Sequence, residues 1–103
     1  MKSNRPASEF GLREEVVASL ESLAQRHSLR RLILFGSRAR GDYRERSDID
    51  LAAEGGDPET FYQDAEDVVP TLLSFDVVNL NRFVSDELRR EIDRDGCLLY
   101  EKI

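Results

Sequence analysis

The chain has 103 residues, of which 40% are hydrophobic and 35% charged, and its formal net charge is −6. This size suits one domain over residues 1–103, and the composition excludes intrinsic disorder. No apolar run approaches the roughly 20 residues that a bilayer crossing requires. The amino terminus MKSNRPASEF lacks a hydrophobic signal core, and the single cysteine, Cys97, excludes an internal disulfide. We therefore expect a cytoplasmic protein without a membrane partner.

Charge is distributed unevenly along the chain. Residues 26–46 contain seven arginines and two acids, a local charge of +5, which leaves −11 on the remainder. An acidic protein binds nucleic acid poorly, because phosphate contacts supply most of the nonspecific affinity. A local positive segment can nevertheless hold one polyphosphate. We therefore expect no direct contact with nucleic acid.

The first half of the chain predicts a helix, a strand, a loop and a second strand. Apolar residues recur at three- and four-residue spacing over residues 9–27, which predicts an amphipathic helix with Ser8 as its N-cap. The apolar run that follows predicts a buried strand over residues 29–35. The segment GSRARGDYRERS (36–47) predicts a loop with a helical turn at its start, and residues 48–53 predict the second strand.

A helix is predicted over residues 58–72. Asp57 suits its N-cap, Pro58 suits its first turn, and Pro70 should deform or end its last turn. We expect this helix to bury Phe61, Ala65, Val68, Val69 and Leu72.

The remaining segments complete a small sheet. LSFDVVNL predicts a third strand, Ser85 is the expected N-cap of a helix through about Arg94, and CLLY predicts a final short strand. This order of elements predicts an α/β (α+β) fold, in which helices pack on a small mixed β-sheet.

Two carboxylates lie one residue apart in the second predicted strand. Side chains alternate between the faces of a strand, so Asp48 and Asp50 should project from the same face and repel each other. A divalent hard cation such as Mg²⁺ relieves this repulsion, because it prefers oxygen ligands. Asp76 in the third strand is a candidate third ligand if the two strands pair. This geometry could hold two metals for a phosphoryl or nucleotidyl displacement.

Gly36 and Ser37 follow the first predicted strand directly. A glycine there allows backbone N–H groups to approach an anion, and the serine hydroxyl adds a donor. The eleven-residue step from Ser37 to Asp48 is long enough for a loop around a triphosphate to return to the sheet edge.

The segments LFGSRARGDYRERSDIDLAAEG and FDVVNL together resemble the minimal nucleotidyltransferases, the small branch of the DNA polymerase β-like nucleotidyltransferase superfamily. The resemblance implies the fold of that superfamily, phosphate contacts from Gly36 and Ser37, and two magnesium ions bound by Asp48, Asp50 and Asp76. It also implies that these three aspartates are the catalytic residues.

The same resemblance implies a reaction and a partner. An acceptor hydroxyl would attack the α-phosphorus of ATP with the help of Asp76, so that AMP is transferred and pyrophosphate is released. Minimal members of the family are typically encoded with a HEPN-domain ribonuclease toxin, and characterised members add AMP to a tyrosine of that toxin. We therefore expect an antitoxin enzyme that uses ATP and Mg²⁺ and forms a hetero-oligomer with a HEPN toxin.

Two other functions stay open. The chain could mask a toxin by binding alone, although its intact acids argue against this. It could also modify a small molecule, such as an aminoglycoside, although it has no second lobe to hold the acceptor.

The roles of five further residues admit two interpretations each. We assign Arg38 to nucleotide binding, because the fixed donor fork of arginine suits phosphate, and leave Arg40 in a solvated basic loop. Tyr43 could stack on a base, but an exposed position in the loop is the simpler expectation. We expect Cys97 to be a small core residue and His27 to be a favourable cation at a helix end.

Overall fold

The computed structural model describes residues 5–103, and a four-stranded mixed sheet forms its centre. Met1–Asn4, the start of the segment that lacks a signal core, lie outside the described residues. The helices and strands are η1 (a 3₁₀ helix, Ala7–Phe10), α1 (Glu14–Arg26), β1 (Arg31–Phe35), α2 (Gly36–Arg40), β2 (Ile49–Glu54), α3 (Pro58–Val68), β3 (Phe75–Asn79), α4 (Asp86–Asp95) and β4 (Cys97–Glu101). Within residues 5–103, no helix is both long and apolar enough to cross a bilayer.

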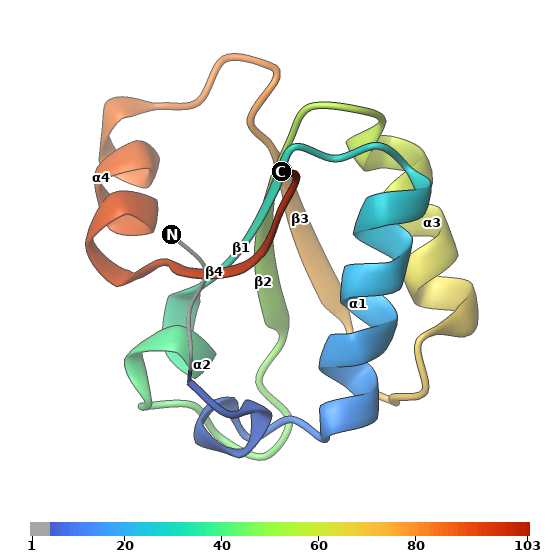
Figure 1. Cartoon of the computed structure of the whole chain (residues 1–103). Helices are drawn as coiled ribbons and strands as arrows, with labels where there is room; N and C mark the ends of the chain where they lie inside the picture. The colour runs from blue at the N-terminus through green and yellow to red at the C-terminus, as the bar shows by residue number, and fades with distance from the viewer. Residues whose placement is uncertain (1–4) are drawn as a thin grey trace.

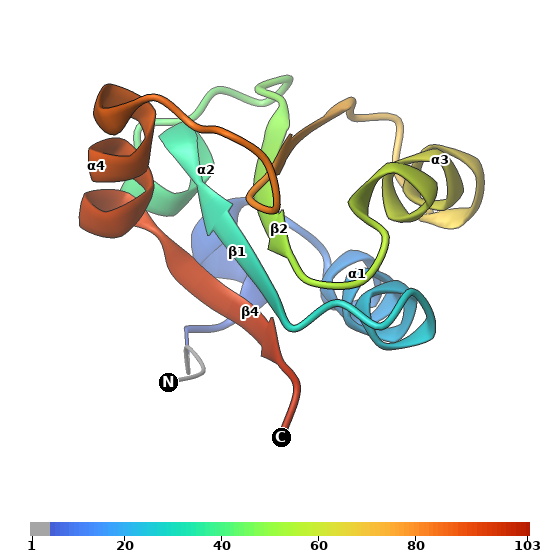
Figure 2. The ribbon, with the colours of Figure 1, turned by 90° about the horizontal axis from the view of Figure 1, so that it is seen from above.

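The strands are arranged in the order β3-β2-β1-β4. β1 pairs antiparallel with both β2 and β4, whereas β2 and β3 are parallel. Figure 1 shows α1 and α3 on one side of this sheet and α4 on the other, and Figure 2 shows the same division from above. The predicted α+β fold with a small mixed sheet is confirmed.

Each face of the sheet has its own apolar cluster. On the side of α1 and α3, Leu32, Leu34 and Leu51 pack with Leu20 and Phe61. On the opposite face, Ile33, Phe35 and Ala52 pack with Ile92 of α4. Because alternate residues of β2 face opposite sides, Asp50 shares the α4 side with Ala52. α4 packs on both α2 and β1 and makes few contacts with β2, the strand that carries Asp50.

The first helix begins later than predicted. Residues 7–10 form η1, Gly11 then has a left-handed backbone with a φ of 68°, and α1 begins at Glu14. Ser8 therefore lies inside η1, and the prediction that it is the N-cap of the long helix is wrong. The residue at the N-cap position is Arg13, which makes no side-chain capping hydrogen bond.

The predicted caps of the two later helices are confirmed. The Asp57 side chain accepts a hydrogen bond from the Thr60 backbone N–H, and the Ser85 side chain accepts one from Leu88. α3 ends at Val68, because Val69 already has the extended backbone that a residue before proline prefers. The predicted burial of Val68 and Leu72 is wrong, since these side chains are 57% and 105% exposed.

Candidate functional site

The three candidate aspartates lie together at one end of the sheet. Asp50 pairs with Phe35, the last residue of β1, and with Asp76 in the parallel register of β2 and β3. Asp50 and Asp76 therefore project from the same face of adjacent strands, whose backbones are about 4.8 Å apart in a sheet. Asp48 immediately precedes β2 and is two residues from Asp50. The pairing of the two strands, which the sequence left conditional, brings the third acid to the first two.

The electrostatics of Asp50 follow from this arrangement. Burial, together with the negative charges of Asp76, Asp48 and Glu91, raises the pKa of Asp50 from 3.8 to about 6, although Arg40 opposes the shift. In the absence of a cation, the ionised carboxylate is therefore less stable relative to the protonated form than that of an ordinary aspartate, although it still predominates at neutral pH. Neither Glu91 nor Arg40 was predicted to lie near the acids, because only the packing of α4 beside α2 places them there.

The metal-free protein should become more stable as the pH falls from 7.5 to 5.0. The pKa of Asp50 is about 6 in the folded state and 3.8 as its ordinary value, so the folded state binds the extra proton in this range. Because proton binding is linked to folding, this proton adds about 1 kcal/mol to the free energy of unfolding at pH 5.0, after allowance for solvent screening of a half-buried carboxyl. Urea unfolding in EDTA at both pH values measures this gain. Asp50→Asn should remove it, and an unchanged pH dependence in that variant would contradict the assignment.

Gly36 permits the close approach of Asp50 to the start of α2. Its φ is 75°, and a Cβ built on it would overlap Oδ2 of Asp50 and lie 3.0 Å from its Cγ. Ser37 follows in the first turn of α2 and is half-buried. The glycine and serine predicted to contact phosphate are thus adjacent to the central carboxylate.

Arg38, which was predicted to bind the nucleotide, is a buried side chain in the structure. Its side chain is 1% exposed, and its guanidinium donates to the backbone carbonyls of Phe10, Gly11, Glu45 and Ser47. The guanidinium also lies 5.0 Å from the centroid of the Tyr43 ring. These contacts use four of the five N–H groups of an arginine. The donors of Arg38 are therefore directed at internal carbonyls, although its guanidinium is close enough to Asp50 for the two charges to interact.

The other polar residues take structural positions. His27 ends α1 and lies 2.6 Å from the Asp64 carboxylate, and Cys97 is buried in the core as predicted. Arg40 lies between acids of the loop and α4, 3.3 Å from Asp42 and 3.5 Å from Glu91. Arg40 therefore connects α2 with α4 beside the aspartates.

The donor chemistry at this end of the sheet suits a magnesium ion. The three carboxylates offer the hard oxygen ligands that Mg²⁺ prefers, and the raised pKa of Asp50 reflects the repulsion that a cation would relieve. Among residues 5–103, however, no group of three His, Cys, Asp or Glu side chains is already gathered so that it could hold a metal. The three aspartates therefore supply the type of ligand atom that Mg²⁺ prefers and lie on neighbouring segments, but their carboxylates are not arranged as a metal site in the described residues.

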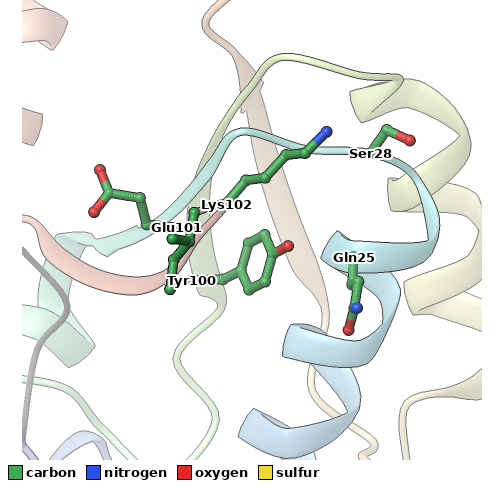
Figure 3. Close-up of a pocket in the computed structure, with 6 residues that line it drawn as sticks. Gln25, Ser28, Tyr100, Glu101 and Lys102 are labelled. Carbon is green, nitrogen blue, oxygen red and sulfur yellow. The ribbon is translucent and has the colours of Figure 1, made fainter.

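Two cavities lie at opposite ends of β2. One, of about 500 Å³, is lined by Asp48 together with Glu45, Arg46, Leu72, Leu73 and Ser74. The other, of about 370 Å³, lies between α1 and β4, where Gln25, Ser28 and Tyr100 surround it (Figure 3). Tyr100 pairs with Leu32 and Leu32 with Ala53, which is near the far end of β2. Of these two cavities, only the first is lined by a candidate aspartate, Asp48.

Residues 18–103 match the family model described as polymerase beta, nucleotidyltransferase. The chain belongs to this family. The predicted resemblance and enzyme class, a nucleotidyltransferase, are thereby confirmed. No curated protein sequence matches the chain significantly.

Solved structures of toxin–antitoxin complexes share the fold of this nucleotidyltransferase. A toxin–antitoxin crystal structure with AMP-PNP matches with a TM-score of 0.68 and 22% identity, over 84% of this chain and 73% of the other. The MntA-HepT toxin–antitoxin structure matches with a TM-score of 0.64 and 19% identity, over 87% and 74%. A tri-AMPylated HEPN toxin from Shewanella oneidensis in complex with an MNT antitoxin matches with a TM-score of 0.62 and 20% identity, over 84% and 71%. At these identities the likeness establishes the fold.

Proposed function

We propose that this nucleotidyltransferase uses Mg²⁺ and ATP to transfer AMP to a tyrosine hydroxyl of a HEPN ribonuclease toxin, and acts as its antitoxin in the cytoplasm. The observation that carries the proposal is the register that places Asp76 beside Asp50, with Gly36 against the same carboxylate, in a chain of this family. The similar structures that hold AMP-PNP or a tri-AMPylated HEPN toxin support the choice of nucleotide and partner.

In this mechanism, the acceptor oxygen forms a bond to the α-phosphorus of ATP, and the bond from that phosphorus to the bridging oxygen of pyrophosphate breaks. Asp48, Asp50 and Asp76 would hold magnesium, which supplies charge neutralisation for the phosphates and lowers the pKa of the acceptor hydroxyl. Asp76 is exposed on the outer strand β3, where an acceptor can reach it, so we assign it the hydroxyl proton.

Gly36 and Ser37 orient the phosphates. Gly36 exposes backbone without a side chain directly beside Asp50, which lets a phosphate approach the same carboxylate. The hydroxyl of Ser37 adds a donor in the adjacent turn. These two residues hold the nucleotide, and the aspartates activate the acceptor.

The cavity beside Asp48 is a suitable place for the acceptor side chain. Its lining combines the polar groups of Glu45 and Arg46 with the apolar side chains of Leu72 and Leu73. Such a mixed lining matches a phenol, which has an apolar ring and a polar hydroxyl.

Intact-mass spectrometry of the chain with its HEPN partner, ATP and Mg²⁺ tests the proposal. We expect the partner to gain one or more AMP units, and Asp48→Ala/Asp50→Ala to abolish the gain while size-exclusion chromatography still shows the complex. The matched control is Asp67→Ala/Asp93→Ala, which removes two exposed acids on α3 and α4 and should retain activity.

The alternative functions give different results in the same experiment. If the partner gains no mass but its ribonuclease activity is still blocked, the chain acts by masking. If neither effect occurs, incubation with labelled ATP and a panel of aminoglycosides tests transfer to a small molecule. Either result would contradict protein AMP transfer.

A further inference from the structure

A segment outside the region matched by the family model contacts the motif loop. We call residues 5–12 the N-terminal segment; the family match begins at residue 18. Ala7, Phe10 and Leu12 of this segment are buried in the main core. The chain then reverses at Gly11, whose left-handed φ of 68° exposes its backbone carbonyl and that of Phe10 to Arg38. The segment is therefore packed against the site rather than trailing from the domain.

Arg38 joins the N-terminal segment to the motif loop. Its Nη1 donates to the carbonyls of Phe10 at 2.9 Å and Gly11 at 3.2 Å. Its Nε donates to Ser47 and its Nη2 to Glu45, both at 3.1 Å. A buried guanidinium is costly unless its donors are satisfied, so the four carbonyls and the charge stabilise one another in this geometry.

Two further contacts tighten the same junction. A Cβ built on Gly11 would lie 2.7 Å from Cζ of Tyr43 and 2.8 Å from Nη1 of Arg38. The N-terminal segment also supplies a donor to α2, because Arg5 donates to the backbone carbonyl of Ala39 at 3.2 Å. The N-terminal segment thus contacts both α2 and the loop that follows it, and it has no room for a side chain at Gly11.

The contact between Arg38 and Ser47 lies one peptide bond from Asp48, a proposed catalytic acid. β2 holds the chain on the C-terminal side of Asp48, whereas the residues between Gly41 and Asp48 form turns and irregular backbone, so no helix or strand holds Asp48 from its N-terminal side. The Ser47 carbonyl that Arg38 binds belongs to the peptide unit whose N–H is that of Asp48. We propose that Arg38 and the N-terminal segment form a positioning element, which sets the backbone of Asp48 relative to Asp50 and Asp76. The N-terminal segment is then part of the catalytic unit.

Two variants disturb this element from its two sides. Arg38→Lys keeps the charge but loses the donor fork, and Gly11→Ala places a methyl group against Arg38 and Tyr43 without changing the motif. Arg44→Lys is the control, because Arg44 is an exposed arginine of the same loop. The activity readout rests on the proposed function, so a second readout uses the protein without metal or nucleotide.

We expect both variants to lower kcat per folded molecule by about 10- to 100-fold, with the KM for ATP changed by less than about 3-fold, because a small displacement of a catalytic group affects the chemical step. In hydrogen exchange, the amides of residues 45–48 should exchange at least about 10-fold faster, while those of β1 and β2 keep their protection. Arg44→Lys should match the wild type in both measurements.

Three results would overturn the inference. A raised KM for ATP in Arg38→Lys, with unchanged exchange over residues 45–48, would make Arg38 a phosphate ligand. Lower thermal stability with wild-type kcat and exchange would make the contacts merely structural. If Arg38→Lys does not fold, wild-type behaviour of Gly11→Ala is sufficient to refute the inference. Absence of AMP transfer by the wild type would refute the proposed function alone, since hydrogen exchange still decides the positioning role.

Discussion

Asp50→Asn is expected to reduce nucleotidyl transfer by about 10³-fold or more, because it removes the central one of three carboxylates that would hold magnesium. The same change should stabilise the metal-free protein at pH 7.5. Burial and the neighbouring acids raise the pKa of Asp50 to about 6, so the ionised group opposes folding at that pH. A neutral asparagine relieves a cost of about 1–2 kcal/mol, after allowance for screening, and should raise the Tm by several degrees.

Single-turnover AMP transfer and calorimetric unfolding in EDTA measure the two effects on one preparation. Asp67→Asn is the control, because this exposed residue of α3 carries the same charge away from the site. It should change neither activity nor Tm appreciably. Asp50→Asn with wild-type activity would remove Asp50 from the mechanism, and a lower Tm would show that the ionised carboxylate contributes to folding. Opposite changes in activity and stability are typical of residues retained for function.

Gly36→Ala is expected to reduce nucleotidyl transfer by about 100-fold or more, because displacement of a catalytic group by about 1 Å has an effect of this size. The added methyl group would overlap Oδ2 of Asp50, so either that carboxylate or the start of α2 must move. The φ of 75° adds backbone strain of about 1–3 kcal/mol for a residue with a side chain.

Gly41→Ala separates these two causes. Gly41 ends α2 with a φ of 95°, and a Cβ built there has no atom within 4 Å. This variant should therefore lose stability by a similar amount, about 1–3 kcal/mol, while its activity stays within a few-fold of the wild type. Steady-state kinetics with urea unfolding of both variants provides the comparison. Equal loss of activity in Gly36→Ala and Gly41→Ala would contradict the inference that Gly36 positions the Asp50 carboxylate.

Patterns within a few residues determined most of the secondary structure. The caps Asp57 and Ser85 were predictable, because a capping side chain bonds to a backbone group three residues away. The shared face of Asp48 and Asp50 followed from the alternation of a strand. The family motif likewise lies in two short segments that can be recognised without knowing how they pair, so the sequence alone was sufficient to predict the fold class and the enzyme class.

Tertiary structure alone decided how the distant parts of the site meet. The register of β2 and β3 places Asp76 opposite Asp50, and the packing of α4 brings Glu91 near the same carboxylate. The burial of Arg38 was not predictable, because its acceptors Phe10 and Gly11 lie more than 25 residues away in sequence. An arginine in a basic loop has the same local pattern whether it faces phosphate or internal carbonyls. Strand register and burial depend on contacts between distant segments, and local periodicity carries no information about them.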